Sequence, residues 1–127
     1  MSISAIIIDD EPKAIQNLSL LIEKHCPSVK IIAHSTEPIQ GIGLIIAKEP
    51  QLVFLDIDMP HLNGFELLEK VKFLPIDVIF VTAYQHFALQ AIKMSALDFL
   101  LKPVSIEELK SAVEKAEKRN QFPQPNP

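Results

Sequence analysis

The chain has 127 residues, of which 48% are hydrophobic and 22% charged, and its net charge is -4 at pH 7. These values predict one globular domain with a sizeable core, and they exclude a disordered chain and a basic surface for nucleic acid. The single cysteine, Cys26, excludes an internal disulfide framework and favours a reducing, cytoplasmic setting, and no apolar run approaches the ~20 residues of a membrane helix.

The first half of the chain alternates short apolar runs with segments of helical periodicity. Residues 3–8 predict a strand, and residues 12–25 predict a helix that opens with proline at its first turn. Residues 29–34 predict a second strand. Thr36 is expected to cap the next helix, which Pro50 ends. The residues predicted for the inner face of that helix are Ile39, Ile42, Ile45 and Ile46.

The second half continues the same alternation. The predicted elements are a strand at 52–55, a helix after Asn63-Gly64, a strand at 77–81, a helix around 87–92, a strand at 97–101 and a helix that begins near Ser105. Strands that are apolar on both faces and alternate with helices predict an α/β fold, in which helices cover both sides of a doubly wound parallel sheet. The domain is expected to span residues 1–119, and the proline-rich, uncharged residues 120–127 to form a flexible tail or linker stub.

Carboxylates close two of the predicted strands. Asp9 and Asp10 follow the first strand, and Asp56 follows the third. In a parallel sheet these strand ends lie at the same edge, where ligands bind. Like charges about 4 Å apart repel by about 4 kcal/mol even at an effective dielectric constant near 20. Such a cluster must therefore recruit a cation, bind a proton or not form.

Four short motifs at successive strand ends resemble those of response-regulator receiver domains. They are Ile8-Asp9-Asp10-Glu11, Leu55-Asp56-Ile57-Asp58-Met59-Pro60 with Asn63-Gly64, Val81-Thr82-Ala83, and Leu101-Lys102-Pro103. The resemblance covers residues 3 to about 118 and implies a flavodoxin-like sheet with strand order 2-1-3-4-5. It also implies that the domain is the phosphoacceptor switch of a two-component system. Such a domain takes its phosphoryl group from a sensor histidine kinase, with Mg²⁺ as its cofactor. It is not an enzyme with a separate substrate.

The resemblance assigns the acidic residues to phosphoryl acceptance and metal binding. Asp56 is implied as the phosphoacceptor and as the donor of one oxygen to Mg²⁺. Asp10 is implied as the direct carboxylate ligand, and Asp9 as a ligand that acts mostly through water. The backbone carbonyl of Asp58 completes the implied protein ligands.

The other site residues are implied to act on the phosphoryl group or to report its presence. Lys102 would pair first with the acceptor and then with the phosphoryl group, and its bond to Pro103 is implied to be cis. The Thr82 hydroxyl and the Ala83 amide would donate to phosphoryl oxygens. Phe99 occupies the position of the family's aromatic switch. The surface expected to change on phosphorylation is formed by helix 4, strand 5 and helix 5. This surface could also pair two copies of the domain.

The amino-acid sequences of residues 82–84 and 96–103 resemble those of receiver domains that precede LytTR-type DNA-binding domains. The chain is therefore expected to be the N-terminal part of a transcriptional regulator that reaches DNA only through a domain absent here.

Two alternatives stay open. Asp56-Ile57-Asp58 also resembles the Asp-x-Asp of haloacid-dehalogenase-type phosphatases, although that motif normally follows the first strand. A phosphorylation-independent interaction domain could instead retain only the fold. Whichever of these holds, Phe99 could be an ordinary core residue of its strand rather than a switch.

Overall fold

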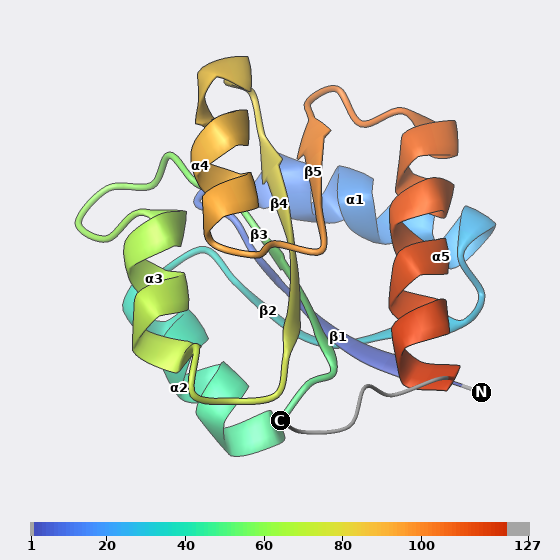
Figure 1. The fold of residues 1–127 in the computed structure, drawn as a ribbon, viewed down its shortest axis with the longest axis horizontal. Coiled ribbons are helices and arrows are strands. Elements are labelled where there is room, and N and C mark those ends of the chain that lie inside the picture. Colours follow the sequence, from blue (N-terminus) through green and yellow to red (C-terminus); the bar gives the residue numbers. More distant parts are fainter. Residues whose placement is uncertain (1, 122–127) are drawn as a thin grey trace.

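A five-stranded parallel sheet forms the centre of the protein, as a computed structural model that describes residues 2–121 shows (Figure 1). The strand order is β2-β1-β3-β4-β5, so the predicted doubly wound fold and its order are confirmed. The elements are β1 Ile3–Ile8, α1 Pro12–His25, β2 Val29–Ser35, α2 Pro38–Lys48, β3 Leu52–Leu55, α3 Gly64–Val71, β4 Asp77–Thr82, the 3₁₀ turn η1 Gln85–Phe87, α4 Ala88–Lys93, β5 Asp98–Leu101 and α5 Ile106–Gln121.

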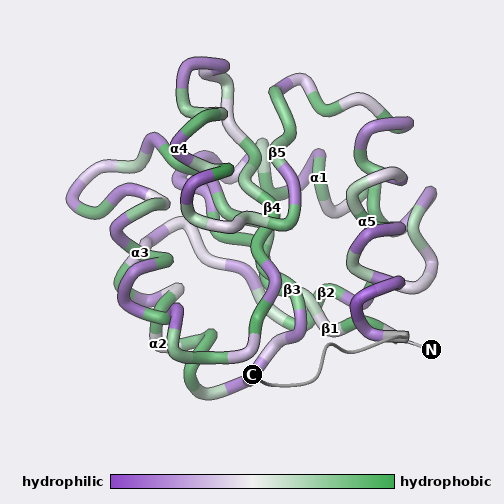
Figure 2. Tube along the Cα trace, in the orientation of Figure 1, coloured by the Kyte–Doolittle hydropathy of each residue, from purple (hydrophilic) through white to green (hydrophobic). Residues whose placement is uncertain are grey.

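Each face of the sheet carries its own hydrophobic core. Successive side chains of a strand point to opposite faces, so Ile7 of β1 packs with α1 and α5, whereas Ile6 and Ile8 pack with α2, α3 and α4. Figure 2 shows hydrophobic residues throughout the central strands. Both faces of the sheet are therefore buried, which explains why the strands are apolar runs without polar alternation.

Local signals position the helices that frame the strand ends. Asn63 accepts the Glu66 amide while the Glu66 carboxylate accepts the Asn63 amide, which is a complete capping box at the start of α3. The Ser105 hydroxyl accepts the Glu108 amide at 3.1 Å and caps α5, which confirms the predicted start of this helix. These caps hold the two helix N-termini beside the strand ends.

The prediction for α2 was wrong in two respects. Its N-cap is Glu37 rather than Thr36, and the side chains of Ile39 and Ile46 are 66% and 50% exposed instead of facing the core. The reason is Gly41, which is buried. A Cβ atom at Gly41 would lie 2.6 Å from Ile8 Cδ1, so the backbone of α2 lies against β1 where a larger side chain had been expected.

The final helix continues beyond the expected domain boundary. Asn120 belongs to α5, and its Oδ1 accepts a hydrogen bond of 2.7 Å from Nε2 of Gln51. The rest of the predicted tail, residues 122–127, lies outside the described residues. Within residues 2–121, no helix combines the length and the apolar character that crossing a membrane requires.

Candidate functional site

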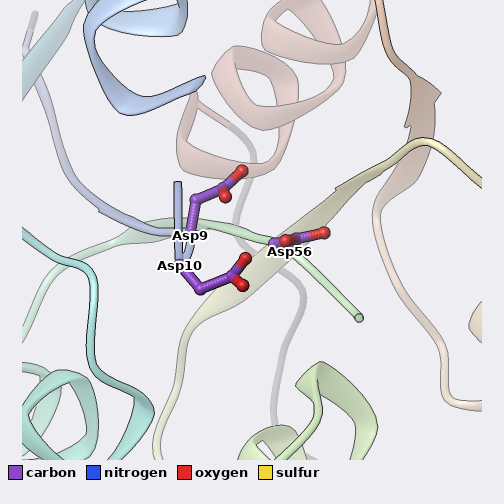
Figure 3. A group of neighbouring side chains, drawn as sticks. All are labelled: Asp9, Asp10 and Asp56. Atoms are coloured by element: carbon purple, nitrogen blue, oxygen red, sulfur yellow. The ribbon is translucent and has the colours of Figure 1, made fainter. Parts of the chain in front are cut away.

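The carboxylates predicted to cluster do meet at one edge of the sheet. Ile8 of β1 pairs with Leu55 of β3, and the Asp56 amide donates to the Ile8 carbonyl at 2.9 Å. The residues that follow these strands are therefore neighbours. One carboxylate oxygen from each of Asp9, Asp10 and Asp56 lies within 4.8 Å of the others (Figure 3).

Lys102 joins this cluster from the end of β5. Its Nζ lies 2.7 Å from Asp9 Oδ2 and 3.8 Å from Asp56 Oδ2. The Lys102 amide donates to the Thr82 carbonyl at 2.8 Å, and the following bond to Pro103 is cis, as expected. Burial disfavours the charged ammonium, but the hydrogen bond to Asp9 and the nearby carboxylates outweigh it and raise the pKa of Lys102.

Asp56 lies at the bottom of the cluster with 5% of its surface exposed. Its Oδ1 accepts the Ile57 amide at 2.8 Å, which aims the other oxygen toward Lys102. Burial and the charge of Asp9 raise the pKa of Asp56 to about 8, against the opposing effect of Lys102. The site therefore holds more negative charge than a single lysine offsets, and a proton or a cation would relieve it.

Asp9 and Asp10 occupy different positions within the cluster although they are adjacent in sequence. Asp9 is 4% exposed, and its Oδ1 accepts the Glu11 amide at 2.9 Å while its Oδ2 meets Lys102. Asp10 is half-buried. Figure 3 shows the Asp10 carboxylate extending toward Asp56, whereas the Asp9 side chain leaves the backbone in another direction. Asp10 is thus placed to share a ligand with Asp56, while Asp9 holds Lys102.

The remaining predicted site residues surround this cluster at different depths. Thr82 ends β4 and is fully buried, and its hydroxyl oxygen accepts the Tyr84 amide at 3.3 Å. Ala83 and Asp58 are exposed in the loops after β4 and β3. Phe99 pairs with Phe80 in the sheet, and its half-buried ring packs against the core that contains α3 and α4. Among residues 2–121, no hydrogen bond or ion pair joins these four side chains to the Asp56 carboxylate.

Two residues near the site were not singled out from the sequence. A Cβ at Gly64 would lie 2.3 Å from the carbonyl oxygen of Asp56, so only glycine lets the start of α3 lie against the Asp56–Ile57 backbone. The Asn63-Gly64 pair belongs to the receiver motif quoted from the sequence, but that resemblance assigned no role to Gly64. Glu11 ends the first receiver motif, and the sequence assigns it no role at the site. It is exposed, yet its Oε1 lies 3.9 Å from Lys102 Nζ and adds negative charge there.

A groove of about 670 Å³ opens beside Lys102, between α1 and the connection from β5 to α5. Asp9 and Lys102 are among the residues that line it, together with apolar residues of α1 such as Leu18 and Leu21 and charged ones such as Lys13 and Lys24.

Comparisons with known proteins agree with this arrangement. The family model of the response regulator receiver domain matches residues 5–114. A response regulatory protein of Vibrio cholerae is 40% identical over 115 residues, and the sensory transduction protein LytT of Enterococcus faecalis is 36% identical over 115 residues. These alignments cover 89% of this chain but 48% and 47% of the relatives, so the chain spans about half of their length.

Solved structures show the same fold. A DNA-binding response regulator of the LuxR family from Staphylococcus aureus superposes with a TM-score of 0.81 at 32% identity, covering 90% of this chain and 98% of that one. The response regulatory domain of mrkE from Klebsiella pneumoniae gives 0.84 at 27% identity, with 93% and 98% covered. The fold, the clustered carboxylates and the family match lead to one assignment: the chain belongs to the response regulator receiver domains of two-component systems.

Proposed function

We propose that this receiver domain accepts a phosphoryl group from a sensor histidine kinase on Asp56. The observation that carries the proposal is the meeting of buried Asp56 with Asp9, Asp10 and Lys102 at the ends of three strands. In the transfer step, an Asp56 carboxylate oxygen forms a bond to phosphorus while the bond between phosphorus and the kinase imidazole nitrogen breaks. The electron pair of that bond returns to the imidazole.

The donor set fits Mg²⁺, because this ion prefers hard oxygen ligands and keeps several of its waters. Carboxylate oxygens within 4.8 Å of one another can share such an ion. Asp10 would bind it directly, Asp9 mostly through water and Asp56 with one oxygen, with the Asp58 carbonyl as a further ligand. When bound, the ion offsets the negative charge that the acceptor and the phosphoryl oxygens bring together.

The chain's own residues would then hold the phosphoryl group. Lys102 would shift from Asp9 toward the new oxygens, the Thr82 hydroxyl would exchange the Tyr84 amide for a phosphoryl oxygen, and the exposed Ala83 amide would donate beside it. Phosphorylation adds roughly -1.5 to -2 charge. A change from mostly inactive to mostly active needs about 5.5 kcal/mol of differential stabilisation. Two or three charge-assisted hydrogen bonds at about 1.5–3 kcal/mol each can supply it.

The readout we propose is a rearrangement of the α4–β5–α5 surface. Phe99 lies on β5 and packs toward α4, so its ring could follow a movement of Thr82. Leu89 and Ile92 of α4 are 63% and 70% exposed, which gives this surface apolar side chains for pairing two phosphorylated copies. The similarity to LytT supports a LytTR-type transcriptional regulator, whose DNA-binding domain would follow this chain and whose setting would be the cytoplasm.

The test is labelling by radioactive acetyl phosphate with Mg²⁺. Asp56→Asn should abolish the label, whereas Asp58→Asn, which changes an exposed neighbour, should retain it. Label that persists in Asp56→Asn would remove Asp56 from the acceptor role. Steady release of phosphate from a generic ester over many turnovers would instead favour the phosphatase alternative, and absence of both label and Mg²⁺ binding would favour an interaction domain.

A further inference from the structure

The last turn of α5 is attached to the sheet by polar side chains and not by hydrophobic packing. Ala116 is fully buried and is the last described residue of α5 in the hydrophobic core. The residues that follow it in the helix are Glu117, Lys118, Arg119, Asn120 and Gln121. A helix end without buried apolar side chains normally frays unless other contacts hold it. The last turn therefore depends on its polar contacts to stay in place.

Two of these residues contact the beginnings of neighbouring strands. Arg119 Nε lies 3.3 Å from Oδ1 of Asp77, which is the first residue of β4. Asn120 Oδ1 accepts a hydrogen bond of 2.7 Å from Nε2 of Gln51, which directly precedes β3. The Asp77 side chain is 16% exposed, and Gln51 and Asn120 are half-buried. Water therefore competes less for these contacts than for an ion pair on the open surface, which contributes little.

A third contact adds the beginning of β2, and Gln51 joins the contacts into one network. Ser28 lies directly before β2, and its hydroxyl donates to the carboxylate of Glu117. The Gln51 side-chain oxygen accepts the Ser4 amide of β1 at 2.9 Å, and the Gln51 carbonyl accepts the Asp77 amide at 3.0 Å. The end of α5 is thus connected with β1, β2, β3 and β4 at their amino-terminal ends. We call this network the polar clasp, and its side chains are Ser28, Gln51, Asp77, Glu117, Arg119 and Asn120.

We propose that the polar clasp fixes the end of α5 against the sheet, so that the chain leaves this domain at the same position before and after Asp56 is phosphorylated. The clasp and Asp56 lie at opposite edges of the sheet, because Gln51 precedes β3 and Asp56 follows it. Five residue steps of extended chain, at about 3.3 Å each, place them about 16 Å apart. Figure 1 shows the end of α5 at the edge of the sheet where β1 begins. A rearrangement at Asp56 therefore reaches the clasp only across the length of the sheet.

A fixed exit restricts how the phosphorylation signal can leave the domain. A domain that follows α5 then receives no displacement of the helix to which it is attached, so its activation depends on contacts made by the α4–β5–α5 surface. The part of α5 that can take part in that rearrangement is its first half, which begins at the Ser105 cap. This consequence rests on the proposed phosphorylation of Asp56, whereas the attachment of the last turn does not.

Amide hydrogen exchange of the unphosphorylated 127-residue chain, followed residue by residue by NMR, tests the clasp. The amides of residues 118–121 should exchange at least about tenfold more slowly than in an unstructured chain of the same sequence. The double variant Arg119→Ala/Asn120→Ala should speed their exchange about tenfold, because it removes two of the contacts. Alanine favours a helix more than either original residue, so a change of helix propensity alone would slow the exchange instead.

Lys118→Ala is the matched control, because it also removes one positive charge from the last turn. Within residues 2–121, the Lys118 ammonium forms no ion pair. The control should leave the exchange of this turn unchanged within about twofold. Gln51→Ala is the complementary variant, since it leaves α5 intact and should speed the exchange of residues 118–121 about threefold. A double variant that exchanges no faster than Lys118→Ala, or an original last turn that exchanges as fast as an unstructured chain, would overturn the clasp.

Phosphorylation tests the fixed exit. With Mg²⁺ and an excess of acetyl phosphate, the exchange of amides in α4 and β5 should change, while that of residues 118–121 should stay within about twofold. Asp56→Asn in the same mixture is the control for effects of the reagent. A change of more than about fivefold at residues 118–121 would overturn the fixed exit. Absence of label on Asp56 would instead refute the proposed function and this second step with it, whereas the exchange of the unphosphorylated chain would still decide the clasp.

Discussion

Lys102 lies closer to Asp9 than to the proposed acceptor Asp56, at 2.7 Å from one carboxylate and 3.8 Å from the other. The ammonium is therefore held near the acceptor by a neighbouring residue, and only a short movement separates it from a phosphoryl group on Asp56. Besides the proposed metal contact, Asp9 therefore acts on Asp56 in two opposing ways. Its charge raises the pKa of Asp56, and its carboxylate positions Lys102, whose charge lowers that pKa.

Lys102→Met should slow phosphorylation of Asp56 by acetyl phosphate by about tenfold or more, because it removes a cationic side chain that faces the developing charge. The rate of label incorporation at saturating Mg²⁺ measures this. Lys102→Arg is the control, since it retains the charge on a bulkier head group and should recover part of the rate. Equal rates for Lys102→Met and the unmodified chain would show that Lys102 does not act on the phosphoryl group.

The stability of the Mg²⁺-free protein should fall as the pH rises from about 4 to about 8. The pKa of Asp56 is raised from 3.8 to about 8 on folding, so between these values the folded state retains a proton that the unfolded chain releases. This stabilisation is complete below the pKa of Asp56 in the unfolded chain, and it is lost as the pH rises through the pKa of Asp56 in the folded protein. Between the two values the free energy of unfolding falls by up to about 1.4 kcal/mol per pH unit. Urea unfolding in EDTA at a series of pH values measures it.

Asp56→Asn is the matched variant for this measurement. It should remove most of the slope and make the Mg²⁺-free protein more stable than the unmodified one above about pH 8, because no buried charge then opposes folding. A slope that is unchanged in Asp56→Asn would assign the pH dependence to other groups, such as Asp77, whose pKa burial also raises.

Mg²⁺ affinity should rise with pH over the same range, because the ion must displace the proton from Asp56. The increase should approach tenfold per pH unit below about pH 8, and isothermal titration calorimetry should detect the released proton as a buffer-dependent heat. Asp10→Asn should weaken binding at every pH. A Mg²⁺ affinity that does not vary between about pH 6 and about pH 8 would contradict a site that includes Asp56.

Gly64→Ala should lower both stability and phosphorylation. The added methyl group would lie 2.3 Å from the Asp56 carbonyl oxygen, and it can be accommodated only if α3 moves away from the acceptor. We expect a loss of about 2 kcal/mol in the free energy of unfolding. Gly43→Ala is the control within the same chain, because its Cβ meets nothing within 4 Å. It should stabilise the chain by about 0.5–1 kcal/mol.

Much of this protein could be predicted from its sequence, because its signals are local. The apolar β-branched runs, the prolines and the caps at Asn63 and Ser105 each depend on neighbouring residues, so the order of strands and helices follows from them. Carboxylates directly after the first and third strands must meet once these strands pair, so the cluster of Asp9, Asp10 and Asp56 was predictable too.

Only the tertiary structure decided how these side chains divide their roles. The sequence contains no indication that Lys102 pairs more closely with Asp9 than with Asp56, because that depends on where the ends of β1, β3 and β5 lie in space. The outward face of α2 was equally hidden. A helix with isoleucine on every side has no distinctive apolar stripe, and the contact of Gly41 with Ile8 determined which of those isoleucines face the sheet and which face solvent.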